Sequence, residues 1–592
     1  MGTRSKFAAF AVPAAIAANL ASAQTTELVS LTSSGAPSDG GGYYPSLSAT
    51  GRWIAFHSQA TNLFSGDDND LLDVFVRDRA TGQTTLVSAD AAGAVGNGSS
   101  YYPSISADGR WVAFVSDART LVAGDTNGVR DIFVRDRQTG ATVRASVDSY
   151  GHQGNGGCYR PMVSADGRFV AFGSDAANLV EGDVNGTADI FVRDLAAGTT
   201  VRVSVDSAGG GANGLSAQPS ISADGRYVAF CSWASNLVPG DTNGVADVFV
   251  RDTATGRTAR VSLDAGGAQV MLDCSDAYLS ADGRSVAFCS ASALVPGDTN
   301  GTRDVFVRDL RAGRLARVST DSAGIQSDGE SSSPVLSPDG RFVAFRSAAT
   351  NLVAGDTNPF ADVFVKDVLS GQTRRASVDS QNAEADGDSQ TPALSADGRS
   401  VAFGSAATNL VAYDPNDQPD VFVHDLGLIV PLPFCSADGA SIPCPCGNAG
   451  DAGNGCENSL GTGGGGVAAS GIARLSFDSL VLVSWGEPSA VACVFMQGSA
   501  SSGAVRFGDG LRCLAGTQLR LYFEITSIGS ASAPTGSEQR ISERSATLGD
   551  PIPIGATRYY QVAYRDPSSS FCPPPFGGTW NVTSGVAVVW AD

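Results

Sequence analysis

The sequence predicts an all-β fold: a seven-bladed β-propeller closed by the N-terminal strand, followed by a small disulfide-rich β-sandwich domain. Three observations predict the propeller. A Gly-Arg turn recurs seven times at intervals of 57 or 58 residues, each repeat holds four β-prone segments, and the last repeat lacks its fourth segment. The turn glycines are Gly51, Gly109, Gly167, Gly225, Gly283, Gly340 and Gly398.

Each repeat is expected to form one four-stranded blade. In the second repeat we expect strands at residues 102–106, 110–116, 131–136 and 142–147, with the Asp108-Gly109 turn joining the first two. Asp-Gly between two apolar runs is typical of a β-hairpin. Apolar residues occupy both faces of the second strand, as expected of a sheet packed between neighbours.

The ring is expected to close through the N-terminus. Residues 25–32 are similar to the segment that ends every repeat except the seventh, for example residues 84–88 and 142–146. An N-terminal strand in the seventh blade removes an exposed sheet edge. A parallel β-helix, the structural alternative, needs shorter repeats and gives no reason for the missing segment.

The first residues are typical of a secretory signal peptide. Arg4 and Lys6 precede an apolar run at residues 7–20, and Ala21-Ser22-Ala23 is a small-residue cleavage site. We therefore expect an exported protein that is secreted, periplasmic or on the cell surface. The predicted domains are 1–23 signal peptide, 24–428 propeller, 429–433 linker and 434–592 Cys-rich domain.

Composition limits the partners. The formal net charge is -21, which argues against nucleic acid and anionic membrane surfaces because both need basic patches. No stretch after the signal peptide is long and apolar enough to span a membrane. We expect a monomer that binds a protein, a peptide or a glycan.

Eleven cysteines agree with export into an oxidising compartment. Cys274 and Cys289 lie nearly opposite each other on one predicted hairpin, so a disulfide between them is expected. Cys158 and Cys231 are then left to pair between adjacent blades. Seven further cysteines follow residue 430, and among them Cys444, Cys446 and Cys456 offer zinc ligands as an alternative to disulfides.

The repeat resembles a known family. The Ser-Ala/Pro-Asp-Gly-Arg turn, the strand ending Ala-Phe-x-Ser and the later Asp-Val-Phe-Val-Arg-Asp strand are similar to the WD40-like repeats of TolB-type bacterial propellers. The segment Ser337-Pro338-Asp339-Gly340-Arg341 matches the turn most closely. The resemblance covers about residues 25–428 and implies the fold. The Cys-rich domain contains Phe-Cys-x-x-Asp-Gly at 434–439, Cys-Pro-Cys-Gly-Asn at 444–448 and Tyr-Gln-Val-Ala-Tyr-Arg-Asp-Pro at 560–567. With these motifs it resembles a domain found in exported bacterial proteins of unknown role.

A loop motif, Asp-x-Asn-x-x-x-Asp, recurs in every repeat. Its oxygen side chains can surround a hard cation, and the motif resembles a shortened calcium loop of integrin-type propellers. Asp and Asn also build turns by bonding their own backbone, which needs no metal. The calcium candidates are Asp67, Asn69, Asp73, Asp125, Asn127, Asp131, Asp414, Asn416 and Asp420.

Residues that recur in all seven repeats are most simply explained as blade-building residues, whereas a ligand site should use residues that differ between blades. The variable positions lie in the connections between repeats: Gly151-His152-Gln153, Tyr159-Arg160, and residues 271–273 and 384–388. We expect these connections to share one face with the Asp-x-Asn loops.

No catalytic constellation stands out in the sequence. There is no Gly-x-Ser-x-Gly motif, and the chain has only three histidines. The sequence therefore predicts a non-enzymatic scaffold that binds its partner on the loop face. The alternative is a carbohydrate-active enzyme, a glycosidase or a lyase, that uses carboxylates at the channel mouth. Such an enzyme requires blades that break the repeat there with acids and aromatic residues.

Overall fold

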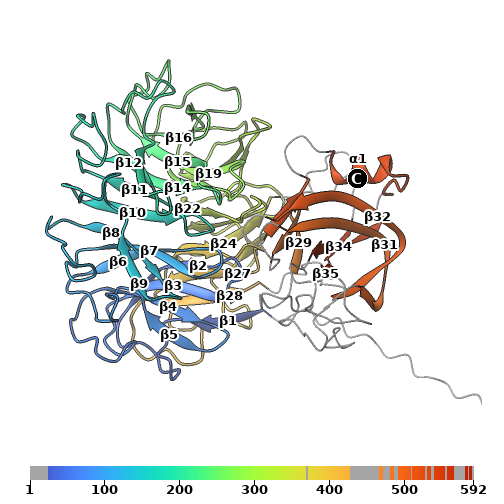
Figure 1. Ribbon diagram of the computed structural model, residues 1–592, viewed down its shortest axis with the longest axis horizontal. Helices are drawn as coiled ribbons and strands as arrows, with labels where there is room; N and C mark the ends of the chain where they lie inside the picture. Colours follow the sequence, from blue (N-terminus) through green and yellow to red (C-terminus); the bar gives the residue numbers. More distant parts are fainter. Residues whose placement is uncertain are drawn as a thin grey trace, which may run out of the picture.

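The computed structural model describes residues 24–368, 371–426 and, with gaps, 466–589. Seven four-stranded antiparallel sheets form within residues 24–426 (Figure 1). This confirms the predicted seven-bladed propeller. The first strands are β2 (Gly42–Leu47), β6 (Ser100–Ile105), β10 (Cys158–Val163), β14 (Ser216–Ile221), β18 (Cys274–Leu279), β22 (Ser331–Leu336) and β26 (Ser389–Leu394).

The second and third strands form the middle of each blade. The second strands are β3 (Trp53–Ser58), β7 (Trp111–Ser116), β11 (Phe169–Ser174), β15 (Tyr227–Ser232), β19 (Ser285–Ser290), β23 (Phe342–Ser347) and β27 (Ser400–Ser405). The third strands are β4 (Asp73–Asp78), β8 (Asp131–Asp136), β12 (Asp189–Asp194), β16 (Asp247–Asp252), β20 (Asp304–Asp309), β24 (Asp362–Asp367) and β28 (Asp420–Asp425).

The fourth strands are shorter, and the N-terminus supplies the last of them. They are β5 (Gln83–Leu86), β9 (Ala141–Arg144), β13 (Thr199–Arg202), β17 (Arg257–Arg260), β21 (Leu315–Arg317), β25 (Thr373–Arg375) and, in blade 7, β1 (Thr25–Leu28). Strand β1 pairs antiparallel with β28, with Thr25 opposite Asp425 and Leu28 opposite Phe422. The ring is therefore closed by the N-terminal strand, as predicted.

The first strands surround the central axis. Each contacts the first strands of both neighbouring blades, and β26 returns to β2. The hydrophobic cores lie between blades: Val76 of blade 1, for instance, shares a buried cluster with Phe114 and Phe133 of blade 2. These two rings are fully buried, with their centroids 6.0 Å apart. In the turn between β6 and β7, Gly109 has a φ of +75°, and a Cβ added to it would lie 2.3 Å from the Trp53 side chain of the preceding blade. The turn therefore requires glycine for both backbone angle and space.

The predicted disulfides of the propeller are not formed. Cys158, Cys231, Cys274 and Cys289 are buried free thiols. Cys274 lies opposite Ser290, whereas Cys289 lies opposite Ser275. Neighbouring residues of a strand point to opposite faces, so the two thiols of this hairpin point away from each other. Cys158 and Cys231 belong to different inter-blade cores.

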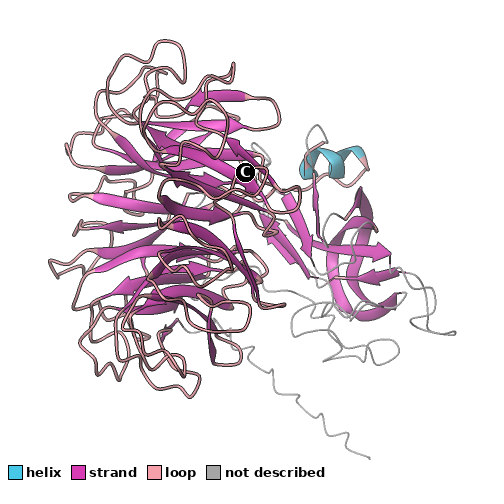
Figure 2. Ribbon diagram, turned by 60° about the vertical axis from the view of Figure 1, so that its left-hand side comes forward, coloured by secondary structure: helices cyan, strands magenta, loops and turns pink. Residues whose placement is uncertain are grey.

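The C-terminal region adds two further sheets (Figure 2). One contains β29 (Gly466–Ser470), β30 (Val481–Trp485) and β33 (Ser530–Ala533). The other contains β31 (Ala492–Phe507), β32 (Gly510–Ile525), β34 (Thr557–Arg565), β35 (Trp580–Val582) and β36 (Val586–Val589). Val467 and Leu482 of the first sheet share a buried cluster with Phe495 and Tyr560 of the second, so the sheets pack face to face. A helix, α1 (Ile541–Thr547), was not predicted.

Some predictions fall on residues that the structure does not describe. The signal peptide at residues 1–23, the linker, and Cys435, Cys444, Cys446, Cys456 and Cys572 lie outside the described residues, so they stay predictions. Among the described residues, no helix is long and apolar enough to cross a membrane.

Candidate functional site

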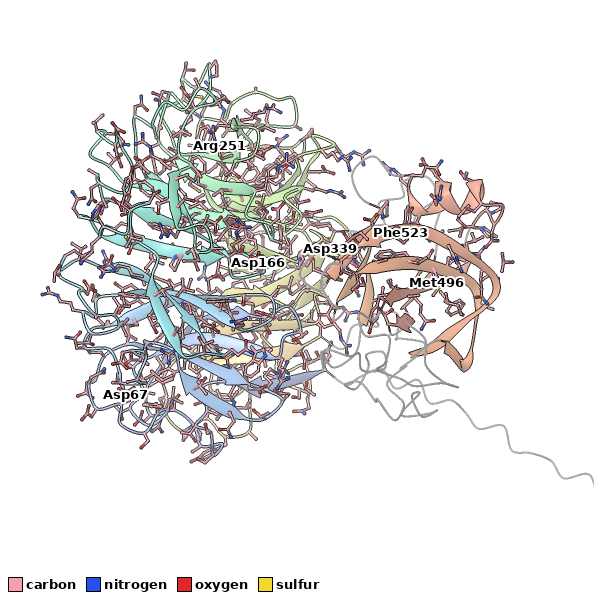
Figure 3. All side chains as sticks on the ribbon, in the orientation of Figure 1. Asp67, Asp166, Arg251, Asp339, Met496 and Phe523 are labelled. Carbon is pink, nitrogen blue, oxygen red and sulfur yellow. The ribbon has the colours of Figure 1, made fainter. Side chains whose placement is uncertain are left out.

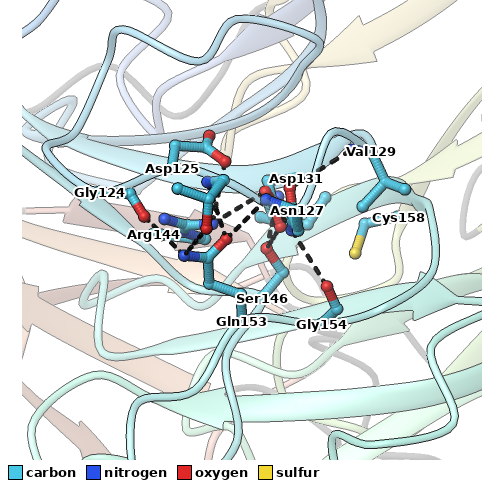
Figure 4. Close-up of polar contacts among 12 residues, drawn as sticks. Gly124, Asp125, Asn127, Val129, Asp131, Arg144, Ser146, Gln153, Gly154 and Cys158 are labelled. Atoms are coloured by element: carbon cyan, nitrogen blue, oxygen red, sulfur yellow. Dashed lines mark hydrogen bonds and ion pairs between the residues drawn. The ribbon is translucent and has the colours of Figure 1, made fainter.

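In blade 2, the predicted calcium motif is joined by an arginine. Asn127 donates from Nδ2 to Asp131 Oδ2 at 2.9 Å, and Ser146 donates to Asp131 Oδ1 at 2.5 Å. Arg144 Nη1 lies 3.3 Å from Asp125 Oδ1 and 3.2 Å from Asp131 Oδ2 (Figure 4). The guanidinium already supplies a cation between the two carboxylates. In this blade, Arg144 Nη1 therefore takes the place between the carboxylates of Asp125 and Asp131.

The other two predicted motifs have no arginine, and they differ in their hydrogen bonds. In blade 1, Asn69 donates to Asp73 Oδ2 at 3.2 Å, and Asp67 lies in the preceding loop (Figure 3). In blade 7, Ser30 donates to Asp420 Oδ1 at 2.5 Å, while Asn416 donates to the Ser38 carbonyl oxygen at 2.9 Å.

Each first strand carries a bulge whose central residue has a left-handed backbone. The register shifts at this point in all seven first-to-second strand pairings. Such a φ is uncommon for residues other than glycine, and bulges re-aim side chains. The bulge residues are Tyr44 (φ 50°), Tyr102 (52°), Arg160 (42°), Gln218 (54°), Asp276 (54°), Ser333 (53°) and Thr391 (49°).

We call the seven bulge residues the channel ring, and several of them contact the bulge residue of a neighbouring blade. Tyr44 and Tyr102 meet edge to face at 4.7 Å, and the Arg160 guanidinium lies 5.3 Å from the centre of the Tyr102 ring. Gln218 Nε2 donates to Asp276 Oδ1 at 3.0 Å. The backbone bulge is common to every blade, but the side chains that it presents differ.

The residues that directly follow the second strands also break the repeat. We call them the mouth row: Gln59, Asp117, Asp175, Trp233, Ala291, Ala348 and Ala406. Asp117, Asp175 and Trp233 are exposed, and Trp233 retains 47 % of its accessible surface. Two acids and a tryptophan therefore lie on blades 2–4, whereas blades 5–7 carry only alanine at this level.

Two tyrosine–aspartate pairs flank Arg130 on the same side of the channel. Tyr101 donates its hydroxyl to Asp117 Oδ2 at 3.2 Å, and Tyr159 donates to Asp175 in the next blade. Arg130 donates to the Tyr101 hydroxyl oxygen at 3.2 Å and stacks over the Tyr159 ring at 4.9 Å. The hydrogen bond to Asp175 raises the pKa of Tyr159, and burial raises the pKa of Tyr101. Both hydroxyls therefore stay protonated at neutral pH.

A cavity of about 370 Å³ opens among these residues. Its lining includes Tyr101, Tyr102, Arg130, Tyr159, Arg160 and Asp175. The size is within the range of small-molecule sites, which combine aromatic walls with a few polar groups. Of the variable connections named from the sequence, Tyr159-Arg160 forms part of this cavity.

The remaining variable connections have other roles. Gly151, His152 and Gln153 line a second hollow of about 520 Å³ beside Asn127. Met271 and Leu272 are exposed. Glu384 pairs with Arg375 at 3.1 Å, so its connection contributes to blade construction.

His57 lies beneath the tyrosines of the channel ring. Its ring stacks on Tyr44 with centroids 5.4 Å apart, and its Nδ1 lies 3.4 Å from the Tyr102 amide nitrogen. Burial lowers the pKa of His57 to about 4. The imidazole is therefore neutral at physiological pH and supports the ring.

Comparison with solved structures finds other propeller proteins at low identity. They include oligogalacturonate lyase in complex with manganese, at 13% identity over 68% of this chain and 90% of that chain, TM-score 0.41. A structure assigned as TolB from Agrobacterium tumefaciens is 16% identical over 50% of this chain and 83% of that chain, with a TM-score of 0.31. A puromycin-hydrolyzing peptidase from Mycobacterium tuberculosis is 14% identical over 65% of this chain and 52% of that chain, with a TM-score of 0.42. TolB-like propellers are thus among the structures that this chain resembles. No protein-family model and no curated protein matches the chain.

These comparisons contradict the prediction of a non-enzymatic scaffold. The similar structures include a lyase, acylaminoacyl peptidase and a prolyl endopeptidase, all enzymes with propellers. The chain spans about half the length of the peptidases. Sequence reasoning missed Asp117, Arg130, Asp175 and Trp233. A column-by-column comparison of the seven repeats singles out Asp117, Asp175 and Trp233, because blades 5–7 carry alanine in the mouth row. It does not single out Arg130, whose position carries arginine again in blade 5.

Proposed function

We propose that the protein is a carbohydrate-active enzyme, a glycosidase or a lyase, with its site at the channel mouth of blades 2–4. The observation that carries the proposal is the asymmetry of the mouth row. Asp175, three tyrosines and two arginines line one cavity in blades 2–4. The mouth row adds Asp117 and Trp233 in these blades, whereas blades 5–7 present alanine at this level. This departure from seven-fold similarity is what the enzyme alternative requires, since construction would repeat in every blade.

The residues divide into binding and proton-transfer roles. Trp233 and Tyr102 offer ring faces for the apolar face of a sugar, and Arg130 and Arg160 offer donors for its hydroxyl or carboxylate oxygens. Asp117 and Asp175 are exposed carboxylates, each held by one tyrosine hydroxyl. Paired carboxylates serve as acid and base in glycoside cleavage. We assign them the proton transfers.

The test is a product screen of the full chain on neutral and acidic polysaccharides. New reducing ends report any cleavage, and an unsaturated product absorbing in the ultraviolet reports a lyase. We expect cleavage of at least one polysaccharide, with the second readout deciding between the two reaction types. Absence of both products across a broad panel, with a folded protein, contradicts the proposal.

The glycan partner, export by the predicted signal peptide and the monomeric state belong to the same proposal. Export rests on Arg4, Lys6 and the apolar run that follows them. An exported enzyme meets polysaccharides outside the cytoplasm.

A further inference from the structure

Five blades hold an arginine at one fixed place in the fourth strand. The arginine lies between the first and last aspartates of the loop motif, with Nη1 3.0–3.3 Å from each carboxylate except for one distance of 3.7 Å in blade 5. Each of these carboxylates is buried or nearly so. The arginines are Arg144, Arg202, Arg260, Arg317 and Arg375.

Blades 7 and 1 have leucine at this place. In blade 7, Leu28 of β1 lies opposite Phe422 of β28. In blade 2, Arg144 lies opposite the equivalent phenylalanine, Phe133. Leu86 occupies the same place opposite Phe75 in blade 1. Both blades nevertheless keep the two aspartates of the motif. In each of these two blades, a pair of carboxylates therefore lacks the cation that the same fold supplies five times.

In blade 7 the consequence is visible at individual atoms. Asp414 Oδ1 and Asp420 Oδ2 are both buried and without a hydrogen-bond partner in the described structure. Asp420 is 0 % exposed, and its other oxygen is taken by Ser30 and Ser38. In blade 6 the equivalent Asp356 Oδ1 also accepts no hydrogen bond, but it lies 3.1 Å from Arg375 Nη1, so its charge is paired. Burial, followed by the charge of Asp420, raises the pKa of Asp414 to about 6.

Two carboxylates with buried, unpaired oxygens are costly unless a positive charge joins them. We propose that blade 7 binds a calcium ion between Asp414 and Asp420, in the place that Arg Nη1 occupies in blades 2–6. A divalent cation neutralises both carboxylates, and calcium prefers oxygen ligands. Asp67 and Asp73 of blade 1 form a second, weaker copy, because no orphaned oxygen is found there among the described residues.

Further ligands follow from equivalence with the other blades. The arginine Nη2 reaches the backbone carbonyl just before the first aspartate, at 3.4 Å from Gly182 and 3.4 Å from Gly297. Tyr413 has this position in blade 7. The described residues contain no cluster of three acidic, histidine or cysteine side chains fit for a metal, so the carbonyl and water complete the shell. A dissociation constant of roughly 10⁻⁴–10⁻³ M, as in extracellular calcium modules, follows from so few charged ligands.

The site joins the two ends of the ring. Asp420 begins β28, and β28 pairs with the closing strand β1. A calcium ion bound to Asp420 therefore stabilises the blade in which the N-terminal and C-terminal parts of the propeller meet. Slower hydrogen exchange in β1 is the expected local sign.

The experiment measures the melting midpoint of the full chain in EDTA and in rising CaCl₂, with MgCl₂ at matched ionic strength. The parent is expected to show a midpoint that rises and saturates at millimolar calcium. Leu28→Arg is expected to lose most of this rise and to melt above the parent in EDTA, because the tethered guanidinium replaces the ion. Asp414→Asn also loses the rise, and it serves if the arginine variant does not fold. Leu86→Arg is the matched control and should keep most of the response.

Three results overturn the proposal. They are a parent midpoint that ignores calcium, a response that survives both Leu28→Arg and Asp414→Asn, and a response that only Leu86→Arg abolishes. None of these measurements uses enzymatic activity, so the outcome is independent of the proposed function.

Discussion

Replacing Arg144 by leucine gives blade 2 the arrangement that blades 1 and 7 have naturally. The Arg144 side chain is 8 % exposed, and those of Asp125 and Asp131 are 2 % and 1 % exposed. Removing one member of a buried ion pair costs about 3–5 kcal/mol, because the remaining charge stays buried. The leucine regains part of this by burying apolar area. We expect a net loss of about 3 kcal/mol.

That loss converts into a measurable shift of the melting midpoint. An unfolding entropy of about 2.1 cal/mol/K per residue gives about 0.8 kcal/mol/K for roughly 400 propeller residues, so the midpoint should fall by about 3–4 °C in EDTA. Calorimetry of Arg144→Leu against the parent measures it. Adding Asp125→Asn to the variant should recover much of the loss, since one buried charge disappears. A midpoint within about 1 °C of the parent, or no recovery in the double variant, refutes the ion-pair argument.

Three further perturbations test the fold. Burial lowers the pKa of His424 from 6.5 to about 4, so this imidazole takes up a proton at a lower pH in the folded state than in the unfolded chain. Its contribution of about 3 kcal/mol is present above pH ~6.5 and is lost as the pH falls towards 4. His424→Asn should therefore melt with a weaker pH dependence than the parent, and an unchanged difference between pH 7.5 and pH 4 contradicts this. Phe114→Ala removes a fully buried ring and should cost about 3–5 kcal/mol in denaturant unfolding; a cost below about 1 kcal/mol would show that the inter-blade core is not tightly packed. Removing residues 1–28 exposes the edge of β28, and light scattering should then detect association; a stable monomer would mean that closure by β1 is dispensable.

The repeat pattern was sufficient to predict the blades and their closure, because each strand type recurs with its own residues and the fourth strand is missing once. Residues 131–136 of the second repeat were placed without error as β8. The disulfides failed because a one-residue offset along a strand reverses the face, as Cys274 and Cys289 illustrate.

The candidate site was harder to predict. Pro103 follows the bulge residue Tyr102, and a proline follows the bulge residue in six of the seven blades. A proline favours extended backbone at the preceding residue, so the left-handed backbone of Tyr102 could not be inferred from the sequence. The role of Arg144 depends on which residue of β9 faces the loop, and this register is known only from the structure. The mouth row is readable in the repeats, but only once Asp117, Asp175 and Trp233 are seen to lie at one level of the channel.

The most direct test of the enzymatic proposal compares kcat/KM of the parent, Asp175→Asn and Thr391→Ala on the polysaccharide that the parent cleaves best. Thr391 belongs to the channel ring but lies in blade 7, away from the cavity. Loss of a proton-transfer group typically lowers the rate by about 10²–10⁴-fold. The account predicts such a loss for Asp175→Asn with an unchanged melting midpoint, and a rate within about threefold of the parent for Thr391→Ala. Equal rates for the parent and a folded Asp175→Asn would contradict it.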